Sequence, residues 1–466
     1  MTKKSATRVV AFGLVAVFVI AGLGSLGSAG SVGIDDVEPI TGTTTAFGGG
    51  SYVAFKLRDA RFAVIYGTSG NPGYITIASE TSRYLGMAEV RDQNGRQLRS
   101  GPISVRSVFA NQLRFALEWR DANGNGIEDD GVPEGNQAAV EAVKGMSLYR
   151  AWEMVGLAEV DASEGRAWTF TLRAVNMSYE RVWDSAGPRN GTATDGEVER
   201  MEFTFHVSLT ERNVEGDMPT FNVTYDTSPG NGPQGRERIT AVDRNGTYRY
   251  NGTALRCGIK YDHLIEGWDF AHNDSQLAIG TKGFLGVRVP SDAPEWMRER
   301  FREQVMNRYG MEGETNIPTG GQNMSVNGSW SGGPRLVTRD EISSDDNWQR
   351  VGRFAWESQL QVTNAGQMQN LSVRYQVHHA SRVSIRGIED AGDFEGFAYQ
   401  GAFIYPKGEV IFHDPLMESE ALFDLGPGLT GQSRFRWLVV AQVGVVATAL
   451  VGVVAYRLLK KKGKGR

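Results

Sequence analysis

The sequence predicts a mainly β protein with two antiparallel β-sandwich-like extracellular domains, one short amphipathic helix and a C-terminal transmembrane helix. Three observations lead to this prediction. Apolar and polar residues alternate over many segments between residues 51 and 428, turn-forming glycines and asparagines separate these segments, and a long uncharged run lies near the C-terminus. Antiparallel sheets with one solvated face produce such alternation, and two of them packed together form a sandwich.

The clearest strand is expected at residues 201–210, where Met, Phe, Phe, Val and Leu alternate with Glu, Thr, His, Ser and Thr. A period of two places one set of side chains on a core face and the other in solvent. The segments 168–174, 221–225 and 371–377 repeat this pattern. Strands of this kind account for most of the region between the two ends of the chain.

A change in composition divides that region. Residues 227–238, TSPGNGPQGRER, have the glycine and proline content of a linker. The predicted organisation is a flexible lead-in at 31–50, a first β-sandwich domain at 51–226, the linker at 227–238 and a second β-sandwich domain at 239–428.

One helix is predicted at residues 293–309. Asp292 and Glu295 have the spacing of a capping box, and Pro294 is tolerated in the first helical turn. Apolar side chains then recur every four residues, at Met297, Phe301, Val305 and Tyr309. A helix packed on a sheet is the interpretation we adopt, and an amphipathic helix on a membrane surface is the alternative.

The two ends of the chain indicate a membrane. Residues 437–456 contain no charge, and at 1.5 Å per residue a helix of this length spans about 30 Å, the thickness of a bilayer core. Six basic residues follow at 457–466, which predicts a cytoplasmic tail by the positive-inside rule. Residues 1–30 have the basic start, apolar centre and small residues of a signal peptide, with an uncleaved N-terminal anchor as the alternative.

The charge distribution agrees with this topology. The net charge of −5 combines +9 from the two basic ends with −14 from residues 9–456. An acidic central region argues against nucleic acid as a partner. The expected localisation is the cell membrane, with a single pass through 437–456, the region between the ends outside the cell and the C-terminus in the cytoplasm.

Nine N-x-Ser/Thr sequons predict a glycosylated exterior. A polar β protein rich in Asn, Ser and Thr is the alternative explanation. The sequon asparagines are Asn176, Asn190, Asn222, Asn245, Asn251, Asn273, Asn323, Asn327 and Asn370. The single cysteine, Cys257, permits no internal disulfide and is expected to be a small buried apolar residue.

An acidic loop after the strand-like sequence FALEW is a candidate Ca²⁺ site. Oxygen donors alternate along it, and a glycine at position 126 allows a sharp turn, as in EF-hand loops. Val132 stands where a full EF-hand has a bidentate Glu, so weak affinity is expected. A hairpin turn without an ion is the equal alternative. The candidate ligands are Asp121, Asn123, Asn125, Ile127, Asp129 and Asp130.

No catalytic motif stands out. The sequence has no nucleophile elbow, no zinc-protease motif and no phosphate-binding loop. Trp330 and Trp348 lie in polar surroundings and are candidates for stacking on a ligand, with partial burial as the alternative. Acidic residues are plentiful, so a glycosidase that uses a pair of carboxylates is kept as an alternative function.

Three segments are distinctive: the acidic loop after FALEW, KYDHLIEGWDF at 260–270 and IFHDP at 411–415. In these segments the chain resembles single-pass exported surface proteins of archaea. The resemblance implies an exported β architecture and adds no catalytic residue. The expected function is a structural, adhesive or recognition role at the cell surface with a protein or glycan partner; a surface hydrolase acting on glycans or peptides, and a viral envelope spike, are the alternatives.

If the acidic loop binds Ca²⁺, a chelator should lower the melting temperature of the full-length protein, and added Ca²⁺ should restore it. A ligand that binds only the folded state stabilises that state by mass action. Differential scanning calorimetry with EGTA and then with millimolar CaCl₂ measures the effect. An unchanged melting temperature at saturating Ca²⁺ would reject the site.

Overall fold

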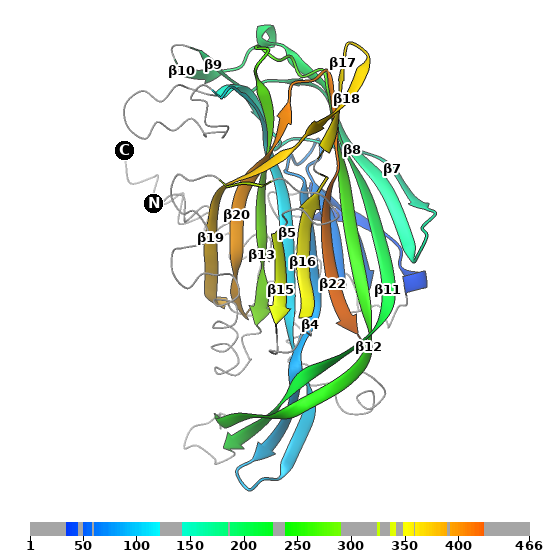
Figure 1. Cartoon of the computed structure of the whole chain (residues 1–466), viewed down its shortest axis with the longest axis vertical. Helices are drawn as coiled ribbons and strands as arrows, with labels where there is room; N and C mark the ends of the chain where they lie inside the picture. Colours follow the sequence, from blue (N-terminus) through cyan, green and yellow to red (C-terminus); the bar gives the residue numbers. More distant parts are fainter. Residues whose placement is uncertain are drawn as a thin grey trace.

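The prediction of a mainly β protein is confirmed. The computed structural model describes residues 34–44, 50–57, 60–121, 142–184, 187–226, 238–289, 324–326, 336–341, 348–357, 359–388 and 392–423. Within these residues the chain forms 22 strands and two 3-10 helices of three residues each (Figure 1).

The elements follow one another in chain order with mostly short connections. Their bounds are η2 (Ile34–Asp36), β1 (Ile40–Thr44), β2 (Gly50–Leu57), β3 (Ala60–Tyr66), β4 (Thr76–Asp92), β5 (Gln97–Trp119), β6 (Ala142–Ser147), β7 (Glu153–Val160), β8 (Arg166–Ser178), β9 (Arg181–Asp184), β10 (Gly187–Asn190), η4 (Ala193–Asp195), β11 (Glu197–Asp226), β12 (Arg238–Glu266), β13 (Gln276–Val289), β14 (Met324–Val326), β15 (Leu336–Glu341), β16 (Trp348–Trp356), β17 (Gln359–Asn364), β18 (Gln367–Ser372), β19 (Arg374–Ile388), β20 (Gly392–Pro406), β21 (Val410–His413) and β22 (Pro415–Phe423).

Nineteen of the 22 described strands form two layers over one core, and β6, β9 and β10 continue in that order from β5. The first layer has the hydrogen-bonded order β1–β2–β3–β4–β5–β13–β20–β19–β14. The second begins β7–β8–β11–β12 and then branches, to β22–β16–β15 on one side and to β21–β17–β18 on the other. Contacts between the layers include the rings of Phe55 and Trp168, whose centroids lie 5.0 Å apart.

The two halves of the chain are interleaved within these layers. β11 and β12 form one long hairpin, in which Asp226 pairs with Arg238 across the predicted linker. β5 from the first half pairs with β13 from the second along most of its length. One hydrophobic cluster contains buried residues from both sides of residues 227–237. This arrangement differs from two sandwiches with separate cores, because strands of each half complete the sheets of the other.

A four-stranded arm extends beyond the two layers, at the bottom of Figure 1. It consists of the last part of β4, the first part of β5, residues 211–226 of β11 and residues 238–252 of β12. Residues 220–225 of β11 pair in parallel with residues 87–92 of β4, which is the one parallel pairing among the described strands. The arm therefore connects the layers through the order β5–β4–β11–β12.

Several predicted segments lie outside the described residues. These are the N-terminal segment 1–30, the helix at 293–309, and the transmembrane helix at 437–456 with its basic tail. Within the described part of the chain, no helix has the length and apolar character required to cross a membrane.

Glycines in the strands make room for aromatic rings on the neighbouring strand. Gly283 of β13 is paired with Tyr399 of β20, and a Cβ at Gly283 would overlap the tyrosine ring. Gly280 stands in the same relation to Phe115 of β5. This packing explains why glycines, which are usually depleted in strands, occur at buried positions here.

Gly283→Val should destabilise the protein by about 1–3 kcal/mol, because the added side chain overpacks a filled site. Gly70→Ala is the matched control, since Gly70 has no atom within 4 Å of its would-be Cβ, and its effect should stay within about 0.5 kcal/mol. Urea unfolding of the full-length protein in detergent measures both changes. Equal stabilities for the two variants would contradict the packing argument.

Candidate functional site

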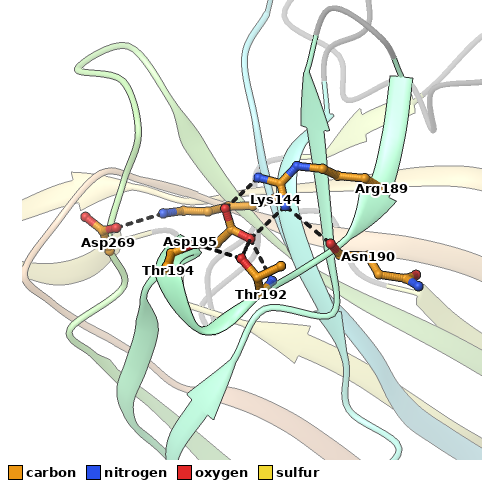
Figure 2. A network of polar contacts seen from close by, with 7 residues as sticks. All are labelled: Lys144, Arg189, Asn190, Thr192, Thr194, Asp195 and Asp269. Atoms are coloured by element: carbon orange, nitrogen blue, oxygen red, sulfur yellow. Dashed lines mark hydrogen bonds and ion pairs between the residues drawn. The ribbon is translucent and has the colours of Figure 1, made fainter.

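A polar network occupies the end of the molecule opposite the arm (Figure 2). It surrounds the connection from β10 to β11, where η4 makes a single turn. The carboxylate of Asp195 accepts hydrogen bonds from the backbone N–H of Thr192, at 2.7 Å, and from its hydroxyl, at 2.9 Å. Acidic and hydroxyl residues with this spacing fix a helix start by satisfying its free donors.

Arg189 holds the same carboxylate from the other side. Its Nη1 and Nη2 lie 2.9 Å and 2.6 Å from the two oxygens of Asp195, in the bidentate geometry that guanidinium and carboxylate favour. Hydrogen bonds from Arg189 and Thr192 hold the pKa of Asp195 well below its ordinary value. Arg189 Nη1 also donates to the backbone carbonyl of Asn190, at 3.3 Å. This contact holds the backbone of the sequon residue Asn190.

A buried lysine lies next to this turn. The side chain of Lys144 is 6% exposed, and its Nζ is 3.1 Å from Oδ2 of Asp269, which is 67% exposed. The ammonium also lies 4.4 Å from the centre of the Tyr179 ring, a cation–π contact. Burial raises the pKa of Tyr179 well above its ordinary value, so the phenol stays neutral.

Glu118, on β5, is a buried carboxylate at this end. It faces Lys144 in the β5–β6 register and accepts hydrogen bonds from Nε1 of Trp268, at 3.3 Å, and from the N–H of Ala271, at 2.9 Å. Each of these charges therefore has a fixed partner, as buried charges require. The network is suited to holding the connections at this end rigid.

A second polar cluster lies inside the core, where the sequence segments 260–270 and 411–415 meet. His263 of β12 is paired with His413 of β21, and the Nδ1 atoms of both lie within 2.9 Å of the Tyr405 hydroxyl. Nε2 of His413 lies 3.0 Å from the carbonyl of Glu357. The cluster is enclosed by aromatic rings, including Phe203.

These contacts determine the proton positions. A carbonyl only accepts, so Nε2 of His413 carries a hydrogen, and Nδ1 of the neutral ring then accepts from Tyr405. The Tyr405 oxygen in turn accepts from Nδ1–H of His263, whose Nε2 has no hydrogen-bond partner among the described residues. Burial lowers the pKa of His413 to about 4 and that of His263 well below its ordinary value. Both imidazoles are therefore neutral.

Ion pairs lie on the outer face of the second layer, next to this cluster. Nζ of Lys260 lies 3.1 Å from Asp262 and 3.1 Å from Asp414, and Nε2 of His206 lies 3.0 Å from Asp262. Burial raises the pKa of Asp414, and Lys260 partly opposes that effect. Because the ammonium bridges the two carboxylates, this cluster differs from the pair of a glycosidase, which leaves room for a sugar and a water.

The structure describes only part of the predicted Ca²⁺ loop. Asp121 is half-buried and lies two residues after β5 ends at Trp119, and Asn123, Asn125, Ile127, Asp129 and Asp130 lie outside the described residues. Within the described part of the chain, no group of three His, Cys, Asp or Glu residues is arranged to hold a metal ion. Trp330 also lies outside the described residues, and Trp348 begins β16, paired with Glu341.

The described sequon asparagines are at the surface. Asn222 is half-buried and hydrogen-bonds to Asn245, whose Nδ2 donates to its Oδ1 at 2.8 Å. The others are exposed: Asn176, Asn190, Asn245, Asn251, Asn273 and Asn370. Asn323 and Asn327 lie outside the described residues. Cys257 is buried and forms no disulfide, and burial raises the pKa of its thiol well above the ordinary value.

No known protein family and no curated protein matches the chain. The described residues form two layers of strands with a projecting arm.

The neutral histidines make stability depend on pH. The ordinary histidine pKa is 6.5, so between pH 6.5 and about 4 the unfolded chain binds more protons than the native protein, and stability falls as pH falls. Well below pH 6.5 the free energy of unfolding should fall by about 1.4 kcal/mol for each histidine as the pH falls by one unit. Urea unfolding of the full-length protein between pH 7 and 5 measures it.

His263→Phe should remove one histidine's share of this slope, because the aromatic pocket suits a phenyl ring and Tyr405 keeps its bond to His413. His206→Gln is the control, because His206 lies on the outer face and its loss leaves the core cluster intact. If His263→Phe kept the full slope, the neutral-imidazole assignment would be wrong.

Proposed function

We propose that the protein is a membrane-anchored, N-glycosylated cell-surface protein with a structural, adhesive or recognition role. The observation that carries the proposal is the placement of the sequons. Six of the seven described sequon asparagines are exposed and the seventh is half-buried, although many other residues of these strands face the core. An acceptor asparagine must be accessible to carry a glycan.

The position of the last described strand supports an anchor at 437–456. β22 ends at Phe423, which is paired with Thr253 where β12 enters the arm. Thirteen residues, 424–436, separate this point from the apolar run, and extended they reach at most about 45 Å.

The pairing of charged side chains favours a binding or structural role over a catalytic one. Next to η4 and on the outer face of the second layer, carboxylates are paired with arginine or lysine, as in Arg189–Asp195 and Lys260–Asp414. A hydrolytic site needs a free acid or nucleophile beside a space for substrate. The absence of a disulfide is compatible with export, because a core this large supplies stability without one.

The proposal predicts that the apolar run anchors the chain. Val445→Lys with Val446→Lys places two charges at the middle of 437–456, at a cost of about 5–7 kcal/mol for insertion. On fractionation, the fraction of protein found outside the membrane pellet should be at least tenfold larger for the variant than for wild type. Val445→Ile with Val446→Ile, the matched control, should remain in the pellet.

Glycopeptide mass spectrometry of the full-length protein, isolated from a host that glycosylates exported proteins, completes the test. Glycans are expected on the exposed asparagines, such as Asn176 and Asn370. A protein without glycans that fractionates with the cytosol would refute the proposal.

A further inference from the structure

Lys144 of β6 and Asp269, in the connection from β12 to β13, form an ion pair in which the lysine is buried. Nζ of Lys144 lies 3.1 Å from Oδ2 of Asp269, and Figure 2 shows the two side chains directed toward one another. The lysine side chain is only 6% exposed, although lysine is among the residues that proteins bury least often. An ammonium and a carboxylate in contact contain all the atoms of one amide bond and one water.

Aromatic rings hold the amine of Lys144 in a fixed position. Its Nζ lies 4.4 Å from the centre of the Tyr179 ring, which packs edge-on against Trp268 with the centroids 5.1 Å apart. Both rings belong to the buried core. A lysine kept out of water beside apolar groups is a setting in which proteins use the amine as a nucleophile.

The segment that carries Asp269 is fixed beside this amine. The backbone N–H of Asp269 donates a hydrogen bond to the Tyr179 hydroxyl, at 3.0 Å. The carboxylate lies against Gly196, where a Cβ would come within 2.9 Å of Oδ2, so the glycine leaves room for it. The side chain of Asp269 is 67% exposed, and a water released from its carboxyl group can therefore escape to solvent.

Glu118 of β5 connects the two groups. It lies directly opposite Lys144 in the β5–β6 register, and such residues have Cβ atoms about 5 Å apart on one face of the sheet. Its carboxylate oxygens accept hydrogen bonds from Nε1 of Trp268 and from the N–H of Ala271, on either side of Asp269 in the chain. Glu118 thus holds the Asp269 segment in place and supplies a buried carboxylate opposite the lysine.

We propose that Lys144 and Asp269 form an intramolecular isopeptide bond, with Glu118 as positioning residue and proton relay. The nitrogen of Lys144 attacks the carboxyl carbon of Asp269, and a C–N bond forms as one C–O bond breaks. One of the three ammonium hydrogens stays on the amide, and two leave with the departing oxygen as water. Glu118 accepts the first of these protons and returns it to that oxygen. No atom is oxidised or reduced, and no co-reactant is needed.

The fixed positions of the two groups favour this condensation. Reacting groups held in contact behave as if their concentration were about 10⁵ M or higher. The fold keeps Lys144 and Asp269 together although 125 positions separate them in the chain. The bond ties β6 covalently to the connection between β12 and β13, which a chain with one cysteine cannot achieve through an internal disulfide.

Peptide mapping by mass spectrometry of the full-length protein tests the bond. A host without N-glycosylation is used, because the tryptic peptide 261–282 contains the sequon at Asn273. Residues 121–150 and 261–282 should appear as one linked species, about 18 Da (one water) lighter than the sum of the two peptides. In an unlinked chain trypsin cleaves after residue 144, and Lys144→Arg and Asp269→Ala should each give this result.

Lys260→Arg is the matched control. Lys260 lies at the same 3.1 Å from a carboxylate, that of Asp414, but it is 33% exposed, and its replacement should leave the linked species unchanged. Glu118→Gln keeps the side-chain shape and removes the charge, so the yield of linked species should fall about tenfold or more, with the β content unchanged in circular dichroism.

The wild-type protein decides the matter without any variant. If folded wild type yields only unlinked peptides, with cleavage after residue 144, the isopeptide bond is refuted and Lys144 and Asp269 form an ordinary ion pair. If the bond is present and Glu118→Gln forms it in full yield, the role of Glu118 is refuted.

Discussion

The antiparallel ladder between β11 and β12 is the interaction on which the other strands depend. It runs from Arg200 paired with Glu266 to Asp226 paired with Arg238. β8 and β4 are hydrogen-bonded to β11, and β21 and β22 are hydrogen-bonded to β12. The same two strands also leave the layers to form half of the arm. One hairpin, local in sequence, therefore provides the pairing surfaces for strands from both halves of the chain.

The alternation of apolar and polar side chains along these strands could be predicted from the sequence, but the strands that pair with them could not. Phe203, Phe205 and Val207 are buried, as a period of two at residues 201–210 requires. A sequence pattern gives the face of a strand and not the strand beside it. The composition of residues 227–238 therefore indicates a linker, although the strands on either side pair with each other. The parallel pairing of β4 with β11 has no local signal at all.

The same limit applies to the polar clusters. Asp195 and Thr192 are close in sequence, so their capping geometry is a local property. His263 and His413 are 150 positions apart and have no ligand-like spacing, and only the β12–β21 register brings them to one hydroxyl. The segments 260–270 and 411–415 stand out in the sequence, but their shared role becomes visible only through that pairing. Asp269 likewise reaches Lys144 across 125 positions.

Polar side chains are stabilised in different ways on the two faces of the second layer, and the strand register determines which side chain lies on which face. Along β12, His263 faces the core and Asp262 faces outward, because successive side chains alternate. The inward group stays neutral within a chain of hydrogen bonds, since an isolated charge there would have to give up its hydration. The outward carboxylate stays beside a cation, Lys260, which is one-third exposed. A slip of one residue would place Asp262 among the aromatic rings and Tyr261 in solvent, so the polar residues specify the register as firmly as the apolar ones do.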